Sequence, residues 1–334
     1  MSGPLQRLTA AGQRVWIDHL SRDLLATGGL ARMVREDAVS GVTTNPSIFE
    51  RAIAGGTAYD EQLASLPGRA ADPKGAFVAL AVRDVAAACD VLAPVWRASG
   101  GDDGLVSIEV DPHLAHDAGA MVDEAERLRA LAARPNLLVK VPATPAGLVA
   151  VEELTARGVS VNVTLIFALH RHAEAAERYV RGLERLRAAG GEVRRVVSVA
   201  SVFVSRVDAL ADRRLDALGA DPALRGRLGI AGARLAHRQQ GRAFSGDRWR
   251  ALATAGARPQ RCLWASTSEK DPARRDVRYV EALIGPGTIS TMPEETLRAF
   301  RDHGRVAPTL GRGGEQAERL LGRLAAAGLD VDDV

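Results

Sequence analysis

The 334-residue sequence predicts a (β/α)8 TIM barrel of the α/β class, with additional helices in two of its connections. Eight short runs are rich in Val, Ile and Leu and lack clean polar alternation, which is typical of parallel strands buried on both faces. Longer stretches rich in Ala, Leu, Arg and Glu separate them, for example 115–134 and 172–189. Eight such units without a long linker favour one domain over residues 1–334. The alternative, an open doubly wound sheet, normally has fewer strands and glycine-rich turns that this sequence lacks.

The expected strands follow one another along the chain. They are 14–19, 39–44, 105–111, 136–143, 159–167, 196–204, 261–267 and 288–292. The connections 46–104, between the second and third strands, and 208–260, between the sixth and seventh, are too long for one helix each. Local breaks at Leu66-Pro67-Gly68 and at Gly219-Ala220-Asp221-Pro222 divide them, so we expect several helices in each.

A glycine-bearing segment, Gly311-Arg312-Gly313-Gly314, lies between two helix-like stretches. It does not follow a strand, so we expect a loop and not a dinucleotide-binding turn.

The composition is that of an ordinary soluble globular protein, with 46% apolar and 25% charged residues. The net charge is +3 and acidic residues are interspersed with the arginines, so the pI of about 9.2 does not indicate a nucleic-acid surface. No apolar run approaches a membrane span, and the start of the chain lacks the pattern of a leader. We expect a cytoplasmic protein without nucleic-acid or membrane partners, and the isolated Cys89 and Cys262 agree with a reducing compartment.

One lysine stands in an unusual place. The 44 basic residues include only three lysines, Lys74, Lys140 and Lys270, and Lys140 lies inside the apolar run 137–142. Arginine stays protonated, whereas a poorly hydrated lysine can lose its proton and attack a carbonyl carbon. Lys140 is therefore a candidate Schiff-base residue. The alternatives are a buried lysine paired with a carboxylate and a lysine whose ammonium reaches the surface from a strand end.

Polar residues gather where seven of the eight expected strands end. Because the site of a (β/α)8 barrel lies at the carboxyl ends of its strands, these side chains should converge. In strand order they are Asp18; Thr43, Thr44 and Asn45; Glu109; Lys140; Asn162 and Thr164; Ser201 and Arg206; and Ser266.

Each of these residues also has a structural explanation. Asp18 could cap the following helix, and Asn45 before Pro46 is a common turn pair. Glu109 could be the partner that keeps Lys140 charged, and the polar residues of the fifth strand could satisfy backbone groups in the barrel core. Polar groups inside apolar strands cost about 1–3 kcal/mol each unless they are paired or used. Their coincidence on several strands therefore favours a functional site.

The sequence does not indicate a metal site or a nucleophilic serine. His113 and His116, and likewise His170 and His172, lack a convincing third ligand. The sequence has no phosphate-binding loop of the Walker type and no serine in a Gly-x-Ser-x-Gly elbow.

Five segments at the expected strand ends occur in a specific order. They are VTTNPS at 42–47, VSIEVD at 106–111, LVKVPAT at 138–144, VNVTLIF at 161–167 and SVFVSR at 201–206. In content and order they resemble the successive signatures of the transaldolase family, over about residues 15–297. The segments WAST at 264–267 and KDP at 270–272 resemble the longer bacterial branch of that family.

The resemblance implies an enzyme with a class I aldolase mechanism and without a metal or cofactor. Such an enzyme moves a dihydroxyacetone unit from sedoheptulose 7-phosphate or fructose 6-phosphate to glyceraldehyde 3-phosphate or erythrose 4-phosphate, in the pentose phosphate pathway. Its partners would be these sugar phosphates, and we expect a monomer or a homodimer.

The resemblance also implies residue roles. Lys140 would form the Schiff base, Asp18 would act on the C4 hydroxyl, and Glu109 would work through a water positioned by Thr164. The expected substrate-binding residues are Asn45 and Asn162 at the dihydroxyacetone moiety, Ser201, Arg206, Ser266 and Lys270 at the phosphate, and Thr43, which has no assigned part of the substrate.

The chemistry makes independent sense of these residue types. Breaking the C3–C4 bond needs an electron sink, which a protonated imine on Lys140 supplies. The C4 hydroxyl must lose its proton as that bond breaks, and the carboxylate of Asp18 can take it. A terminal phosphate calls for a planar cationic fork, which Arg206 provides.

Three departures from the family pattern bear on substrate choice. Ala168 and His170 replace a serine and an acidic residue, Ser268 stands near the position of an arginine, and the chain stops at Val334, where relatives continue through a further helix. Two alternatives follow. One is a related enzyme that acts on another sugar, and the other is a non-catalytic sugar-phosphate binding protein.

Overall fold

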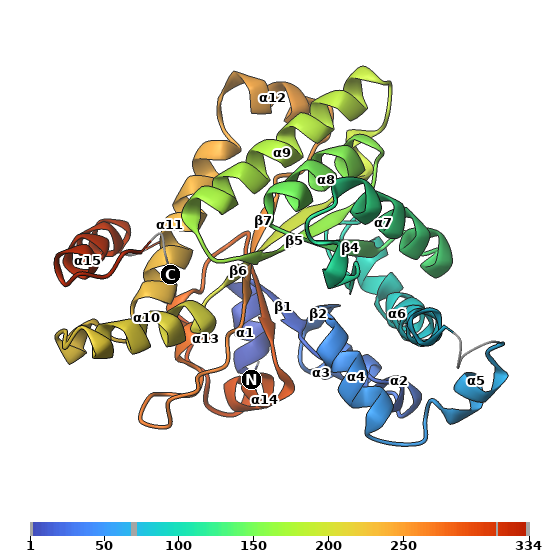
Figure 1. Cartoon of the computed structure of the whole chain (residues 1–334), viewed down its shortest axis with the longest axis horizontal. Coiled ribbons are helices and arrows are strands. Elements are labelled where there is room, and N and C mark those ends of the chain that lie inside the picture. Colours follow the sequence, from blue (N-terminus) through green and yellow to red (C-terminus); the bar gives the residue numbers. More distant parts are fainter. Residues whose placement is uncertain (1–2, 68–71, 312, 332–334) are drawn as a thin grey trace.

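The computed structural model describes residues 3–67, 72–311 and 313–331. Eight parallel strands form a closed barrel in sequence order, and the last strand pairs with the first. They are β1 (Arg14–Ile17), β2 (Val39–Val42), β3 (Leu105–Glu109), β4 (Leu137–Pro142), β5 (Val161–Ile166), β6 (Ser198–Phe203), β7 (Arg261–Ala265) and β8 (Ile289–Met292). Figure 1 shows the strands at the centre and the helices around them. The prediction of a (β/α)8 barrel is confirmed, and each strand lies inside its predicted range.

Helices cover the outside of the barrel (Figure 1). The α-helices are α1 (Pro4–Ala10), α2 (Arg22–Ala26), α3 (Gly29–Glu36), α4 (Pro46–Ala54), α5 (Asp60–Ser65), α6 (Pro73–Ala98), α7 (Ala118–Ala132), α8 (Pro145–Ala156), α9 (Leu169–Ala188), α10 (Ser205–Ala217), α11 (Leu228–Ala243), α12 (Gly246–Thr254), α13 (Arg278–Ala282), α14 (Glu294–His303) and α15 (Gly314–Ala326). Short 3₁₀ turns are η1 (Pro112–Leu114), η2 (Val193–Arg195) and η3 (Pro222–Leu224). Within the described ranges, no helix combines the length and apolarity needed to cross a membrane.

The two long connections contain several helices each, as predicted. The first carries α4, α5 and α6, and the second carries α10, α11 and α12. The first break falls between α5 and α6, although its Gly68 lies outside the described residues. The second coincides with the turn after α10, where Gly219 has a φ of +63°. In the segment 311–314, Arg312 lies outside the described residues, Gly313 precedes α15 with a φ of +101°, and Gly314 is the first residue of that helix.

Local sequence explains where several helices begin. Asn45, Asp72 and Thr144 each precede a proline, and the side chain of each accepts a hydrogen bond from the backbone N–H three residues further on. The side chain satisfies a free amide at the helix start, and the proline presets the helical φ angle. The same capping supports Asn45 at the mouth of the barrel.

The amino-terminal end of the barrel interior is closed by packing. Trp16 is fully buried there, and a Cβ at Gly41 would collide with its indole ring. The indole Nε1 donates to Asp103 Oδ1 at 3.0 Å, and Arg14 Nε lies 3.4 Å from Asp103 Oδ2. Burial raises the pKa of the Asp103 carboxyl, and the positive charges of Arg261 and Arg14 oppose that rise. This end therefore forms a closed floor beneath the opposite end.

Candidate active site

A cavity of about 630 Å³ opens at the carboxyl ends of the strands. Its wall includes ten of the eleven predicted site residues, namely Asp18, Thr43, Asn45, Glu109, Lys140, Thr164, Ser201, Arg206, Ser266 and Lys270. The eleventh, Asn162, is fully buried and is not part of the described wall. The expected convergence of strand-end residues therefore produces a cavity of a size that suits a small ligand.

Lys140 reaches this cavity from β4, and its side chain is 8% exposed. Its Nζ donates to the main-chain oxygen of Thr44 at 2.9 Å and lies 3.6 Å from Glu109 Oε2. An ammonium group has three donors, so one close hydrogen bond orients the amine without occupying it fully. The alternative of a lysine paired with a carboxylate thus describes a real contact, yet the pair faces a cavity and is not sealed in the core.

The Glu109 carboxyl is poised for proton exchange. Its β3 position pairs in register with Lys140, which pairs in turn with Asn162 on β5. Burial raises the pKa of Glu109 above its usual range, and the adjacent Lys140 opposes that rise. A carboxyl with a raised pKa can hold and release a proton closer to neutral pH than an exposed one.

A chain of hydroxyl groups orients Asp18. Thr43 Oγ1 donates to Asp18 Oδ1 at 2.7 Å, and Thr291 Oγ1 lies 2.7 Å from Thr43 Oγ1. Since Thr43 has one hydroxyl proton and gives it to the carboxylate, Thr291 donates to Thr43. The alternative role of Asp18 as a helix cap is wrong, because the side chain of Ser21 caps α2 by accepting from Leu24 N. Asp18 is instead held toward the cavity by β2 and β8.

Asn45 caps a helix and also lines the cavity. Its Oδ1 accepts from Ile48 N at 3.0 Å and caps α4, as the turn alternative expected. Its side chain also lines the cavity. Because the cap uses the carbonyl oxygen, the amide nitrogen, a donor, remains for a ligand hydroxyl.

Asn162 lies behind the wall of the cavity and supports a residue that lines it. Its Nδ2 donates to Ser107 Oγ at 3.0 Å, and its Oδ1 accepts from Ser201 Oγ at 2.6 Å. Ser201 itself lines the cavity. In this arrangement Asn162 connects β3, β5 and β6 and fixes the hydroxyl of Ser201.

A bulge in β5 shapes the wall near Thr164. The register between β5 and β6 shifts between Val163 and Ile166, and Leu165 has a φ of +59°. Non-glycine residues in this conformation cost about 1–3 kcal/mol and persist where the surrounding fold imposes them. Thr164 and Leu165 consequently both line the cavity, although residues adjacent in a regular strand face opposite sides. Ser266, at the end of β7, also has a positive φ, +56°, and lines the cavity.

Cationic groups stand at the rim of the cavity. The Arg206 guanidinium lies 5.2 Å from the ring centre of Phe203, which holds this exposed side chain by a cation–π contact. Lys270 Nζ donates to Ser268 Oγ at 2.8 Å and lies 3.7 Å from Glu295 Oε1. The rim can therefore receive an anion at Arg206, whereas the charge of Lys270 is partly neutralised by Glu295.

Some wall residues were not anticipated from the sequence. They are chiefly Arg51 on α4, Ser205 at the start of α10, Ser268 and Glu295 at the rim, and Thr291 on β8. Ser205 Oγ lies 2.8 Å from Ser266 Oγ. Thr291 could have been predicted from the sequence. It is a polar residue one position before the end of β8, and β8 was the one expected strand to which no polar end residue was assigned. Arg51 carries no such signal, because its place depends on how α4 folds back over the barrel.

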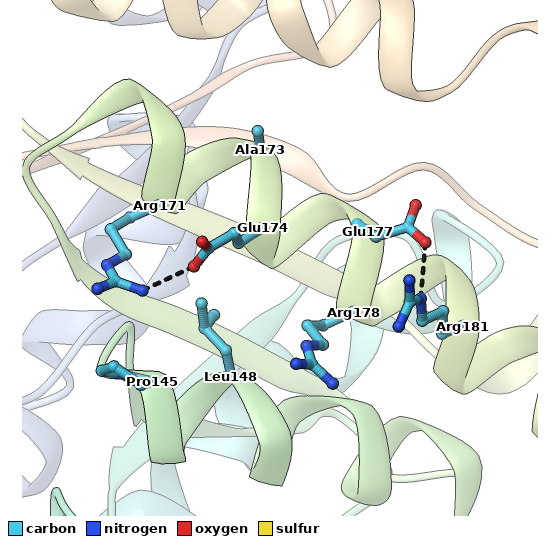
Figure 2. Close-up of a pocket in the computed structure, with 8 residues that line it drawn as sticks. All are labelled: Pro145, Leu148, Arg171, Ala173, Glu174, Glu177, Arg178 and Arg181. Carbon is cyan, nitrogen blue, oxygen red and sulfur yellow. Dashed lines mark hydrogen bonds and ion pairs between the residues drawn. The ribbon is translucent and has the colours of Figure 1, made fainter.

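A second hollow lies outside the barrel between α8 and α9 (Figure 2). There Arg171 Nη1 pairs with Glu174 at 2.7 Å and Arg181 Nε with Glu177 at 2.7 Å. Charges of both signs neutralise one another along this hollow. It offers no group comparable with the Lys140 amine.

Comparison with known proteins identifies the family. A family model described as Transaldolase/Fructose-6-phosphate aldolase matches residues 15–334. The chain belongs to this family. The resemblance inferred from the five ordered segments is thereby confirmed.

Bacterial members of the family align with almost the whole chain. A transaldolase of Frankia alni is 51% identical over 100% of this chain and 91% of its own length. Transaldolase 1 of Streptomyces coelicolor is 51% identical over 100% of this chain and 88% of its own length. A transaldolase of Mycolicibacterium smegmatis is 47% identical over 99% of this chain and 90% of its own length.

The first departure from the family pattern, at Ala168 and His170, lies away from the cavity wall. Ala168 precedes α9 as its N-cap residue, and His170 is exposed on the first turn of that helix. Neither residue belongs to the described wall of the cavity. The second departure, Ser268, does line it and forms hydrogen bonds there with Lys270 and Glu295. The end of the chain at Val334 lies outside the described residues.

Proposed function

We propose that this protein is a transaldolase that transfers a dihydroxyacetone unit between sugar phosphates through a Schiff base on Lys140. The observation that carries the proposal is a buried amine 3.6 Å from a carboxyl of raised pKa, in one cavity with an oriented carboxylate and a cationic rim. The full-length relatives named transaldolase support the same reaction. The donor would be sedoheptulose 7-phosphate or fructose 6-phosphate, and the acceptor glyceraldehyde 3-phosphate or erythrose 4-phosphate.

The first half-reaction forms the imine. The neutral amine of Lys140 attacks C2 of the ketose, and the carbinolamine then loses its hydroxyl as water. Glu109 supplies the proton for that departure through a water molecule held by Thr164, and it regains a proton when water adds back to the imine at the end of the reaction. The result of the water loss is a protonated imine that can accept the electron pair of the neighbouring carbon–carbon bond.

The second step breaks the bond between C3 and C4. The carboxylate of Asp18 takes the C4 hydroxyl proton as the bonding pair moves toward the imine nitrogen, so an aldose phosphate leaves and an enamine remains on Lys140. The hydroxyl chain through Thr43 keeps the accepting oxygen of Asp18 in place. Addition of the enamine to an acceptor aldehyde reverses these steps, and hydrolysis of the imine releases the new ketose.

The rest of the site suits substrate binding. Asn45 can donate to the hydroxyls of the dihydroxyacetone moiety. Arg206, with Ser201 and Ser266, can hold the phosphate, because a planar guanidinium matches a phosphate better than a single ammonium does. Lys270 would assist from the rim in competition with Glu295.

Borohydride trapping tests this proposal directly. The protein is mixed with fructose 6-phosphate, reduced and mapped by peptide mass spectrometry. The reduced dihydroxyacetone adduct should appear on the peptide that carries Lys140, and Lys74 and Lys270 serve as internal controls. Absence of an adduct, or an adduct on another lysine, contradicts the proposed mechanism.

The family description also includes an aldolase, and a simple comparison separates the two activities. A transaldolase makes sedoheptulose 7-phosphate only when erythrose 4-phosphate accompanies fructose 6-phosphate. Release of free dihydroxyacetone from fructose 6-phosphate alone would indicate an aldolase. Tight binding of the sugar phosphate without a trappable imine would indicate a binding protein.

A further inference from the structure

A second cavity, of about 780 Å³, lies outside the barrel between α11, α13 and α15. Eight of its fifteen lining residues are arginines, and no Asp or Glu belongs to its described lining. In Figure 1, α15 lies beside α11 on the outside of the barrel. The arginine cavity, as we name this space, contrasts with the hollow in Figure 2, where Glu174 and Glu177 share the lining with arginines.

The arginines converge from segments that are far apart in sequence. Arg225 and Arg227 precede α11, Arg234 lies on α11, and others come from 274–278 and from α15. The turn at Gly226 makes this convergence possible. It has a φ of +65°, and a Cβ there would collide with the guanidinium groups of Arg274 and Arg278. The cavity therefore depends on the tertiary structure, because its arginines come from several segments and not from one basic helix.

Six of the eight arginines have carboxylate partners that are not part of the described lining. Arg278 Nη1 lies 2.9 Å from Glu269 Oε2, and Arg274 Nη2 lies 3.1 Å from Asp212 Oδ2. A guanidinium has five N–H donors, and such a pair uses only some of them. The described lining of the cavity supplies no carboxylate for the donors that remain. An anionic ligand could accept them without displacing the existing pairs.

Arg227 and Arg234 are the two lining arginines without a carboxylate partner in the described part of the chain. Arg227 is exposed. Arg234 is partly buried. Among the residues that the structure describes, it donates only to the main-chain oxygen of Ala282, at 3.3 Å, and its buried Nε has no hydrogen-bond partner. Burial lowers the pKa of the Arg234 guanidinium, since no nearby carboxylate offsets the desolvation of the charge. A buried donor without a partner is costly, and a bound acceptor would remove that cost.

We propose that the arginine cavity binds a small molecule that carries two or more phosphate groups, with Arg227 and Arg234 as its principal contacts. Guanidinium forks match phosphate oxygens in pairs, and two uncompensated positive charges call for at least two negative charges. The volume lies within the range of small-molecule sites. A nucleic acid would need an extended basic track along its backbone, whereas these arginines surround a compact cavity.

The proposal is tested by isothermal titration calorimetry of the full chain with inorganic tripolyphosphate at physiological salt. We expect one site per chain. Arg234→Met, which keeps an apolar stem of similar length, should weaken binding about tenfold or more, and Arg227→Ala should weaken it severalfold. Arg32→Gln removes an exposed arginine on α3, outside the cavity, and should leave the affinity unchanged.

Further variants separate this cavity from the candidate active site and from a folding defect. Arg206→Gln should retain tripolyphosphate binding, because Arg206 lines the other cavity. Loss of binding in Arg206→Gln, no binding in the unaltered protein, or unchanged affinity in the Arg227→Ala/Arg234→Met double variant would each overturn the proposal. If Arg234→Met does not fold, Arg227→Ala alone decides, because its exposed side chain can be removed without disturbing the core.

Discussion

The two ends of the barrel interior both bury charged groups, and they use them differently. At the amino-terminal end, Asp103 is 2% exposed and its oxygens are engaged by Trp16 and Arg14 beneath close packing. At the carboxyl end, Lys140 is nearly as buried but shares a cavity of about 630 Å³ with Glu109. Burial raises the pKa of both carboxyls. Buried charge alone therefore does not mark a ligand-binding site, whereas buried charge with unused bonding capacity beside an open volume indicates one.

The largest expected effect comes from Lys140→Arg. Arginine keeps the positive charge but cannot act as a neutral amine. We expect kcat to fall by roughly 10⁴-fold or more, with the unfolding transition retained. Steady-state kinetics and circular dichroism measure the two quantities, and Lys74→Arg is the control. Near-normal turnover in Lys140→Arg would refute the assignment of the nucleophile.

Glu109→Gln tests the proton-exchange role at the same end. We expect kcat to fall by about 10²–10³-fold, because an amide cannot exchange the proton. In the unaltered protein, activity should fall as the pH rises through the raised pKa of Glu109, because loss of water from the carbinolamine needs the protonated carboxyl, so this limb should lie above the usual glutamate range. The limb should vanish in Glu109→Gln and persist in Glu295→Gln. A limb that survives in Glu109→Gln would assign it to another group.

The same variant has a stability consequence with a definite sign. A carboxyl whose pKa is raised by folding contributes stability that is fully present below its unfolded-state pKa. That contribution is lost as the pH rises through the folded-state pKa, so the ionised Glu109 is the costly form. Glu109→Gln should consequently show a smaller loss of stability between acid and neutral pH than the unaltered protein, as measured by urea unfolding.

Asp103→Ala probes the closed end of the barrel. It leaves the Trp16 indole nitrogen without its acceptor and removes the buried charge that Arg14 contacts. We expect the free energy of unfolding to fall by about 3 kcal/mol, with kcat unchanged at temperatures where the protein remains folded. Asp102→Ala is the matched control, because Asp102 is 40% exposed in its pair with Arg261 and should matter by less than about 1 kcal/mol. A large loss of kcat in folded Asp103→Ala would contradict the division between the two ends.

Thr291→Val should have the smallest effect. It removes the hydroxyl that donates to Thr43 and thus loosens the orientation of Asp18. We expect kcat to fall about tenfold while KM changes little, because the contact acts on a proton acceptor and not on the substrate. Thr291→Ser retains the hydroxyl and should restore most of the activity. Equal losses in both variants would indicate a packing effect.

The strands, their order and the family could all be predicted from the sequence. Short apolar runs of strand length, alternating with longer amphipathic stretches, predicted all eight strands. Once a closed barrel was assumed, the order of the strands placed Asp18, Glu109, Lys140 and Arg206 at one end, because parallel strands share a direction. Five ordered segments were enough to recognise the family.

Other features depended on contacts between segments that are distant in sequence. Local sequence contains no sign that Thr291 serves Asp18 through Thr43, or that Asn162 stays behind the wall that Ser201 forms. The positive φ of Leu165 is imposed by the barrel, since nothing about a leucine favours it.

The order of residue types along the chain defines which side chains stand at each strand end, and hence the fold, the family and the candidate chemistry. Folding then establishes which of these side chains face an open volume, which are held by a neighbour, and which charged groups lack a partner among the described residues. The arginine cavity illustrates the difference, because 225–227, Arg234 and 274–278 meet only after folding. Periodicity and strand direction are encoded locally, whereas hydrogen-bond partners and desolvation depend on distances across the folded chain.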